Sequence, residues 1–369
     1  MKNIVLSANT SWYLYNFRSS TILALQKQGY NLVCLSPHDE YSQRLVNELG
    51  CKWIEVKMDN QGSNPIKDLI FLFRLFKVYR KIKPVAVFNF TIKNNIYGTW
   101  AARAADVRAI NNVSGLGTTF ITDNLTSKIV RLLYKLSQPF AYKVFCQNPE
   151  DYDLLIDKRL VAKEKLELLP GSGVNVERFS PFLKKTKSSS EPFVFLYVGR
   201  MLKDKGVLEL IEAAITLFDK RQDFILQLCG FADSKNVSAI SERELENLSS
   251  VECIEWLGPS DSIHNIYSGA DCVVLPSYRE GMPRTLLEAG AMGIPCIATN
   301  VPGCKHVITN NLNGYLCDAK SVISLIEAME TMLGLSRIDY QSMCKKSRSH
   351  IVDNFNEEIV VGKTLEALD

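Results

Sequence analysis

Short apolar runs recur along the chain and alternate with longer segments in which apolar residues are spaced three and four apart. The runs predict buried strands, of which Ile4–Ser7 is the first, and the longer segments predict helices such as Asn16–Gln28 and Pro65–Ile82. Strands that alternate with helices across short loops form parallel βαβ units. The pattern therefore predicts an α/β fold built from doubly wound parallel sheets.

A polar break divides this pattern in two. The segment Phe182–Pro192 is rich in lysine and serine and has no periodicity, which is typical of a linker, and an apolar strand follows at Phe193–Gly199. A length of 369 residues is enough for two domains that each bury a core. We therefore expect two Rossmann-like domains, residues 1–187 and 188–350, and a helical end segment, residues 351–369.

The most specific chemistry lies in the stretch Pro276–Ala289. An apolar strand precedes it and a helical pattern begins at Arg284, so a helix should open at the carboxyl end of a strand, where doubly wound sheets bind ligands. Free N–H groups at a helix start favour an anion. Carboxylates repel phosphate, so Glu280 and Glu288 should accept hydrogen bonds from hydroxyl groups beside that anion. An anion between two hydroxyl-rich groups describes a sugar nucleotide.

Glu280 and Glu288, with seven residues between them and the setting Pro-Ser-x-x-Glu-Gly-x-Pro, resemble the signature of the retaining glycosyltransferases of family 4. That family has the GT-B fold, in which two Rossmann-like domains face each other across a cleft. The resemblance implies that Glu280 contacts the donor sugar and that Glu288 binds the ribose. It implies donor binding by Gly281, Met282, Pro283 and Leu286 as well. A pair of glutamates without this setting would more often be two solvated surface residues.

The turn Gly199–Gly206 follows the first strand of the second domain. A glycine lets backbone approach a ligand, and two cations five residues apart, Arg200 and Lys205, can hold a diphosphate. The string resembles the Gly-Arg-x-x-x-x-Lys-Gly motif of the same family, which implies that both cations neutralise the leaving diphosphate. Taken alone, the string fits a solvated basic turn equally well. Glu280, Arg200 and Lys205 are therefore the candidate catalytic residues, and Gly199 joins the donor-binding set.

The loops of the first domain differ from the common family pattern, because the usual Gly-Gly loop after the first strand is replaced by a segment from Asn9 to Arg18. This departure and the segments Thr91–Gly98 and Val113–Gly117 resemble a subgroup that acts on polyprenyl-diphosphate-linked saccharides in bacterial surface-glycan assembly, such as O-antigen or capsule. The alternative is that these are ordinary βα loops. The resemblance implies that residues 351–369 cross back to the first domain, and it gives these candidates for acceptor binding: Asn9, Arg18, Lys93, Asn94, Ser114 and Gly115.

No metal site or cofactor is expected. The string Asp151-Tyr152-Asp153 is predicted to begin a helix after Pro149, and no His/Cys cluster has ligand spacing. The common pattern of the family has a Glu where this chain has Lys305 and His306. The resemblance therefore does not predict how that turn selects the donor. Resemblance implies a front-face displacement that retains the anomeric configuration, with a UDP-sugar as the donor.

Charge is distributed unevenly. Residues 1–190 contain 27 Lys/Arg and 15 Asp/Glu, a net charge of +12, whereas the rest of the chain has −9 within a total of +3. The predicted helix Pro65–Lys83 interleaves basic and apolar residues, which is typical of a helix on an anionic membrane surface; a solvated basic face is the alternative. The partners expected are a nucleotide-sugar donor, a lipid-linked saccharide and an anionic membrane, with no nucleic acid.

The ten cysteines are scattered, without a C-x-x-C motif, and mostly lie in apolar runs. This usage is typical of a reducing compartment. The segment Met1–Ser7 becomes polar too soon to be expected as a signal peptide, and no run of about 18 apolar residues occurs. We therefore expect a cytoplasmic protein that is peripheral on the inner face of the cytoplasmic membrane.

The sequence thus predicts a retaining, metal-independent hexosyltransferase that moves a hexose or N-acetylhexosamine to a polyprenyl-diphosphate-linked saccharide. Two alternatives stay open. A sugar-nucleotide epimerase has the same architecture but normally needs acid/base carboxylates or histidines in the first domain. A non-catalytic module that binds sugar nucleotides or membrane would account for the basic half of the chain.

Overall fold

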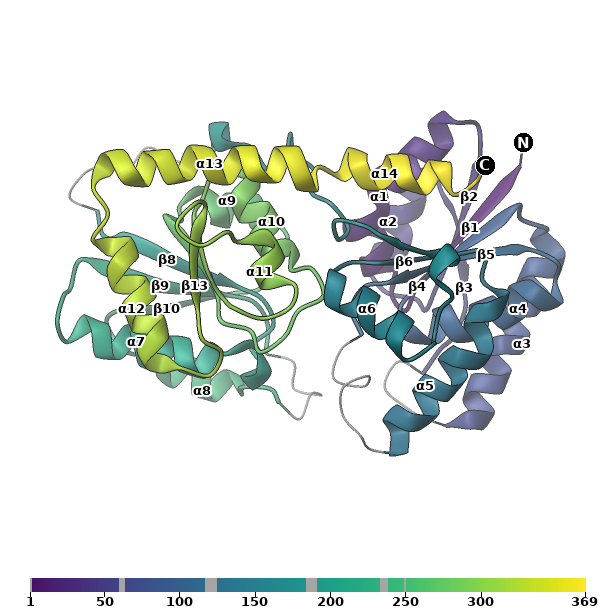
Figure 1. Ribbon diagram of the computed structural model, residues 1–369, viewed down its shortest axis with the longest axis horizontal. Coiled ribbons are helices and arrows are strands. Elements are labelled where there is room, and N and C mark those ends of the chain that lie inside the picture. Colours follow the sequence, from purple (N-terminus) through teal and green to yellow (C-terminus); the bar gives the residue numbers. More distant parts are fainter. Residues whose placement is uncertain (1, 60–63, 117–124, 184–190, 233–237, 249) are drawn as a thin grey trace. The chain divides into compact units, whose positions relative to one another are not determined.

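The computed structural model describes residues 2–59, 64–116, 125–183, 191–232, 238–248 and 250–369. The chain forms two compact units, the first made of Met1–Ser172 with Glu357–Asp369 and the second of Gly173–Asn356. Each unit contains one parallel sheet with helices on both faces (Figure 1). The predicted α/β class, with two doubly wound sheets, is confirmed.

The first sheet has the strand order β3-β2-β1-β4-β5-β6-β7, and every neighbouring pair is parallel. The strand order reverses between β1 and β4, which lie side by side in the middle of the sheet. All residues of β4 are buried, as expected for a strand covered on both faces. The strands are β1 (Asn3–Ser7), β2 (Asn31–Ser36), β3 (Lys52–Glu55), β4 (Ala86–Phe90), β5 (Arg108–Val113), β6 (Lys143–Cys146) and β7 (Leu166–Leu168).

The helices of the first unit connect these strands. They are α1 (Ser11–Lys27), α2 (Tyr41–Asn47), α3 (Pro65–Ile82), the π-helical turn η1 (Asn94–Gly98), α4 (Thr99–Ala104), α5 (Leu125–Ser137), η3 (Gln138–Phe140), α6 (Pro149–Asp157) and η4 (Lys163–Lys165). The predicted start of the first helix at Asn16 is wrong, because α1 already begins at Ser11. Thr10 caps this helix by accepting a hydrogen bond from the Tyr13 amide at 3.1 Å. Tyr13 is therefore held on the first turn of α1.

The second sheet has the order β10-β9-β8-β11-β12-β13, and its strand order reverses between β8 and β11. Its strands are β8 (Phe193–Val198), β9 (Phe224–Cys229), β10 (Ile254–Gly258), β11 (Cys272–Leu275), β12 (Cys296–Thr299) and β13 (Gly314–Cys317). Its helices are η5 (Pro181–Leu183), η6 (Lys203–Lys205), α7 (Val207–Phe218), α8 (Glu242–Leu248), α9 (Ile263–Ser268), α10 (Arg284–Ala291), α11 (Cys304–Val307), α12 (Val322–Leu333) and α13 (Arg337–Phe355).

The units divide earlier in the chain than the expected boundary at 187/188, which itself lies in residues 184–190, outside the described part. The segment after Gly173 packs on the second unit, because the Val174 amide donates to the Phe355 carbonyl at 2.9 Å. The Arg348 guanidinium, on α13, also donates to the Phe179 carbonyl at 2.9 Å. These contacts attach residues 173–183 to the second unit although they precede the polar segment.

The last helix, α14 (Glu357–Glu366), belongs to the first unit and packs beside α1 (Figure 1). The Lys363 ammonium donates to the Leu168 carbonyl at 2.9 Å and pairs with the Glu167 carboxylate at 3.1 Å. Glu167 is shared with Lys143, at 2.6 Å. One carboxylate therefore ties strand β6 and helix α14 to strand β7.

We expect Glu167→Gln to weaken this attachment in a pH-dependent manner. Burial opposes the charge of Glu167, but hydrogen bonds from Lys143 and Lys363 outweigh that effect and lower the pKa of the carboxyl. A lowered pKa means that the stabilisation is present above the unfolded pKa of about 4.3 and is lost as pH falls through the folded pKa.

For partly exposed pairs the loss at neutral pH should be about 1 kcal/mol, measured by thermal unfolding from pH 3 to pH 7. Glu164→Gln, at an exposed position in the same segment, is the matched control. A gap between Glu167→Gln and the parent protein that persisted at pH 3 would contradict this account.

Candidate functional site

The carboxyl edge of the second sheet brings two distant loops together where the strand order reverses. The loop after β8 and the loop after β11 meet through a hydrogen bond from the Tyr278 amide to the Asp204 carbonyl, at 3.0 Å. The Thr285 hydroxyl, on the first turn of α10, donates to the Val198 carbonyl at the end of β8, at 3.1 Å. These bonds fix the start of α10 at the position where a doubly wound sheet binds its ligand.

Lys205 and Glu280 form an ion pair at this edge, although 75 residues separate them in the sequence. The Lys205 Nζ lies 2.6 Å from Glu280 Oε1, and only 18% and 16% of the two side chains are exposed. The buried Ser277 hydroxyl donates to the same oxygen at 2.7 Å. Two of the three candidate catalytic residues are thus in contact, and the hydrogen bond from Ser277 to Glu280 was not predicted from the sequence.

Glycine is required where these loops touch. Gly206 has φ +70°, and a Cβ there would lie 2.2 Å from the Pro276 carbonyl oxygen. Gly303 has φ +85°, and its Cβ would lie 2.8 Å from the carbonyl oxygens of both Glu280 and Gly281. Any side chain at either position would push apart the loops that hold the Lys205–Glu280 pair.

The predicted donor-binding residues around this pair have different surroundings. Gly199 leaves room for Tyr197, whose hydroxyl would lie 2.7 Å from a Cβ at that position and donates to the Arg200 carbonyl at 2.8 Å. Burial, and then the nearby charge of Glu280, raise the pKa of Tyr197. The Arg200 side chain is exposed and Leu286 is fully buried in the core. The Leu286 side chain therefore belongs to the core and does not form part of the exposed surface of the site.

Glu288 lies on α10 and is 9% exposed. The Arg284 guanidinium donates to its Oε1 at 2.7 Å, one helical turn away, and the Tyr267 hydroxyl donates to its Oε2 at 3.2 Å. Burial raises the pKa of Glu288, although Arg284 opposes that shift. The i, i+4 spacing of Arg284 and Glu288 was visible in the sequence, whereas Tyr267 comes from a separate helix and had no local signal.

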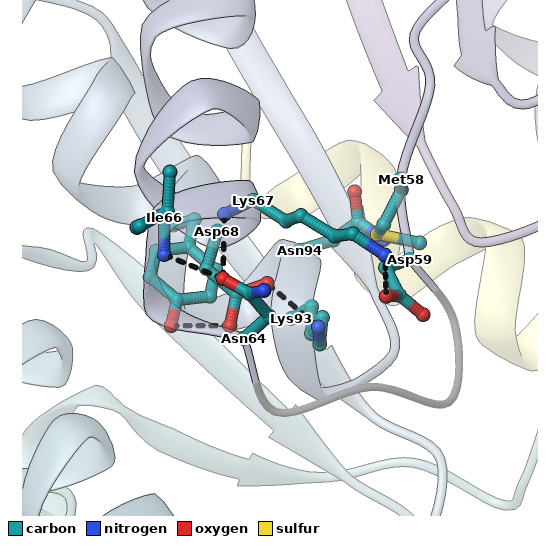
Figure 2. Close-up of polar contacts among 9 residues, drawn as sticks. Met58, Asp59, Asn64, Ile66, Lys67, Asp68, Lys93 and Asn94 are labelled. Carbon is teal, nitrogen blue, oxygen red and sulfur yellow. Dashed lines mark hydrogen bonds and ion pairs between the residues drawn. The ribbon is translucent and has the colours of Figure 1, made fainter.

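Two acceptor candidates of the first unit, Lys93 and Asn94, are engaged by their own chain (Figure 2). Lys93 Nζ lies 2.6 Å from the Asp68 carboxylate, which also accepts from the Tyr97 hydroxyl at 3.0 Å. Asn94 accepts from the Ser7 hydroxyl at 2.7 Å. Both residues therefore hold the turn η1 against α3 and β1.

The other acceptor candidates surround the point where the first sheet reverses its strand order. Arg18, on α1, is 2% exposed, and its Nη2 donates to the Tyr13 hydroxyl at 3.1 Å. That hydroxyl lies 2.9 Å from Ser114 Oγ, directly after β5. Asn9 and Gly115 are half-buried in the neighbouring loops, and Gly115 has φ +136°. Gly117, part of the same predicted motif, lies outside the described residues.

Within the described ranges, no helix combines the length and hydropathy needed to cross a bilayer. Over the same residues, no three His, Cys, Asp or Glu side chains are grouped so that they could hold a metal ion. The predicted helix start at Asp151 is confirmed: this residue lies in the first turn of α6, and its carboxylate accepts from the Leu116 amide at 3.2 Å.

Comparison with known proteins identifies the family. Residues 180–350 match the family model described as glycosyl transferases group 1, and residues 3–148 match the model glycosyl transferase 4-like. An N,N'-diacetylbacillosaminyl-diphospho-undecaprenol alpha-1,3-N-acetylgalactosaminyltransferase of Campylobacter jejuni is 30% identical, over 96% of this chain and 95% of its own length. A UDP-Gal:alpha-D-GlcNAc-diphosphoundecaprenol alpha-1,3-galactosyltransferase of Escherichia coli is also 30% identical, over 79% and 76%.

Solved structures show the same fold. HepE of Anabaena, crystallised with UDP and glucose, superposes with a TM-score of 0.81 at 15% identity, over 100% of this chain and 99% of its own. Sequence motifs, sheet topology and relatives of nearly equal length agree. The chain belongs to the group 1, family 4-like glycosyltransferases and has their GT-B fold.

Proposed function

We propose that this enzyme transfers a hexose or N-acetylhexosamine from a UDP-sugar to a polyprenyl-diphosphate-linked saccharide in bacterial surface-glycan assembly. The observation that carries the proposal is the Lys205–Glu280 pair at the reversal of the second sheet. The names of the Campylobacter and Escherichia relatives, which specify diphospho-undecaprenol acceptors, support the acceptor class.

The donor binds at the carboxyl edge of β8 and β11. Arg200 and Lys205 neutralise its diphosphate, and the N–H groups at the start of α10 add to the positive field. Glu288, oriented by Arg284 and Tyr267, accepts from the ribose hydroxyls. Glu280 accepts from the sugar hydroxyls on the other side of the diphosphate. The two carboxylates thereby define the orientation of the donor.

The reaction proceeds on one face of the sugar. The bond between the anomeric carbon and the diphosphate oxygen breaks, the acceptor oxygen bonds to the same face, and the acceptor proton passes to the leaving diphosphate. This step retains the anomeric configuration. Catalysis rests on positioning and on charge neutralisation by Arg200 and Lys205. Glu280 stabilises positive charge that develops at the sugar ring, an interaction stronger in the transition state than in the ground state.

The function is tested with UDP-sugars and a polyprenyl-diphosphate-linked N-acetylhexosamine, with products separated by chromatography and their linkage assigned by NMR. We expect one UDP-sugar to give an α-linked product, because the donor is α-linked and the configuration is retained. Turnover should be unchanged in EDTA, since cations of the chain neutralise the diphosphate. An isomerised donor in the absence of acceptor would instead identify an epimerase.

Substitutions of Lys205 and of Glu280 should have different effects on UDP binding and on turnover. Lys205→Met removes a charge-assisted contact, so UDP should bind with a Kd about 10-fold to 150-fold higher, the equivalent of about 1.5–3 kcal/mol. Glu280→Gln should not weaken UDP binding, since it leaves Lys205 available to the diphosphate, but it should lower turnover, because the contact of Glu280 is to the transferred sugar.

Calorimetry with UDP and steady-state kinetics make these two measurements. Lys203→Met is the matched control, because Lys203 is exposed in the same turn η6. Equal UDP affinities of the Lys205 and Lys203 variants would remove Lys205 from the diphosphate site.

The enzyme also docks on an anionic membrane through α3 and α5. Helix α5 turns its polar residues inward, with Ser127, Tyr134 and Ser137 buried. Its apolar stripe faces solvent instead: the exposed side chains are Leu125 (75%), Ile129 (49%), Leu132 (54%) and Leu136 (53%). Lys128, Arg131 and Lys135 flank that stripe. This arrangement is typical of a helix that lies in a lipid interface.

Helix α3 adds a second exposed apolar row, with Ile66, Leu69 and Phe73 at least 54% exposed. Both helices pack against the turn η1 of the first unit. Part of the positive charge of α3 is already neutralised within the chain, since Lys67 pairs with Asp59 at 3.0 Å. Apolar burial therefore contributes to membrane affinity beside charge.

We expect Leu132→Ser with Leu136→Ser to reduce co-sedimentation with vesicles that contain anionic lipid. Each half-exposed leucine withdrawn from the lipid forfeits about 1 kcal/mol, so the partition coefficient should fall about 10-fold or more. Ile323→Ser is the matched control, because Ile323 is 72% exposed on α12 of the second unit. Unchanged sedimentation of the double variant would mean that α5 does not contact the membrane.

A further inference from the structure

The first unit contains a buried positive charge, Arg18, for which the described residues supply no acidic partner. Arg18 is 2% exposed, and in the part of the chain that the structure describes no carboxylate pairs with it. Its guanidinium stacks on the Phe90 ring at 4.4 Å, and its Nε has no hydrogen-bond partner among the residues that the structure describes. Burying an unpaired charge is costly, so a fold retains one where the charge has a use.

Arg44, on the neighbouring helix α2, provides a comparison, because it is an arginine with a structural role. Its guanidinium also stacks on aromatic rings, those of Tyr15 and Tyr41, at 4.4 Å and 5.1 Å. It is far more exposed than Arg18, and it pairs with Glu48 at 2.8 Å. Stacking on aromatic rings therefore does not explain why Arg18 lacks a carboxylate partner among the described residues.

Hydrogen-bond accounting shows that a donor remains beside Arg18. The guanidinium can only donate, so the Tyr13 hydroxyl accepts from it. Tyr13 and Ser114 share one hydrogen bond, at 2.9 Å, but carry two hydroxyl hydrogens. Whichever of them donates, one hydroxyl hydrogen is left without an acceptor among the described residues. Both side chains are half-buried, so a ligand can reach that donor.

These three residues lie where the first sheet reverses its strand order. Phe90 is the last residue of β4, and Ser114 follows β5, at the carboxyl edge beside the start of α1. The next residue after β4, Thr91, has φ +74°, which is strained for a β-branched side chain. A positive charge and a free donor, which favour an anion, coincide with the sheet reversal, where doubly wound sheets bind their ligands.

We propose that Arg18, Tyr13 and Ser114 form a subsite for one phosphate of the acceptor diphosphate, with Ser114 or Tyr13 as the direct donor and Arg18 as the charge behind it. This proposal rests on the proposed function, which supplies a lipid-diphosphate acceptor. The donor diphosphate already has Arg200 and Lys205 in the second unit. The acceptor diphosphate therefore remains as the anion that this edge receives.

The experiment compares two acceptors that carry the same saccharide, one on a polyprenyl diphosphate and one on a neutral alkyl group. For Arg18→Met we expect the KM of the diphosphate acceptor to rise at least 10-fold, with the kcat/KM of the neutral glycoside unchanged. Ser114→Ala should give a smaller change of the same kind. Arg44→Met is the control and should alter neither acceptor.

Stability measurements separate this role from a structural one. Methionine keeps the contact with Phe90 and removes the unpaired charge, so Arg18→Met should melt at the same temperature as the parent protein or higher. A clear fall in its melting temperature would assign Arg18 to the fold and overturn the proposal. Equal losses with both acceptors would overturn it as well.

Calorimetry with UDP decides which diphosphate is bound. Unchanged UDP affinity in Arg18→Met supports the acceptor subsite, whereas weaker UDP binding would assign the site to the donor. The parent protein distinguishes this proposal from the proposed function. Transfer to the diphosphate acceptor by the parent, with no selective loss in Arg18→Met, overturns the subsite alone. Absence of any transfer to that acceptor by the parent overturns the proposed function, and the subsite with it.

Discussion

Parallel pairing of β8 with β11 is the constraint on which the candidate donor site depends. The two strands are 74 residues apart, from Val198 to Cys272, yet adjacent pairing places their carboxyl ends at the same edge of the sheet. Only there can Lys205 meet Glu280. The glycines that let the two loops touch and the Thr285 bond to β8 then maintain the contact. The contact between these side chains therefore depends first on the order of the strands in the sheet.

Much of the fold was predictable because its signals are local. Helix α10 begins at Arg284, as the sequence pattern indicated, and α3 has the predicted bounds Pro65–Ile82. Strands β7 and β13 were not predicted, because Leu166–Leu168 has only three residues and Gly314–Cys317 begins with a glycine, a residue that is depleted in strands. The start of α1 was missed because Trp12 and Tyr13 looked like loop residues, although Thr10 is a favourable N-cap.

The candidate site was predictable only where a motif fixes it in the sequence. Spacing identified Arg200, Lys205, Glu280 and Glu288 as candidates, but no local pattern shows that Tyr267 reaches Glu288. The ion pair of Lys93 with Asp68 could not be predicted either, because the first residue caps a π-helical turn and the second lies on a long helix. Partners that tertiary packing supplies cannot be inferred from residue spacing, since they depend on which elements become neighbours.

The pairing of Lys205 with Glu280 has a consequence for the proposed reaction. Before the donor binds, each charge compensates the other in a site that is mostly closed to water, so neither carries the full cost of burial. A diphosphate competes for Lys205 and draws its hydrogen bond away from the carboxylate. Among the described residues, Glu280 then keeps the hydrogen bond from the Ser277 hydroxyl. A carboxylate that has lost its cation attracts sugar hydroxyls and positive charge at the anomeric carbon more strongly, so donor binding itself prepares Glu280 for the transition state.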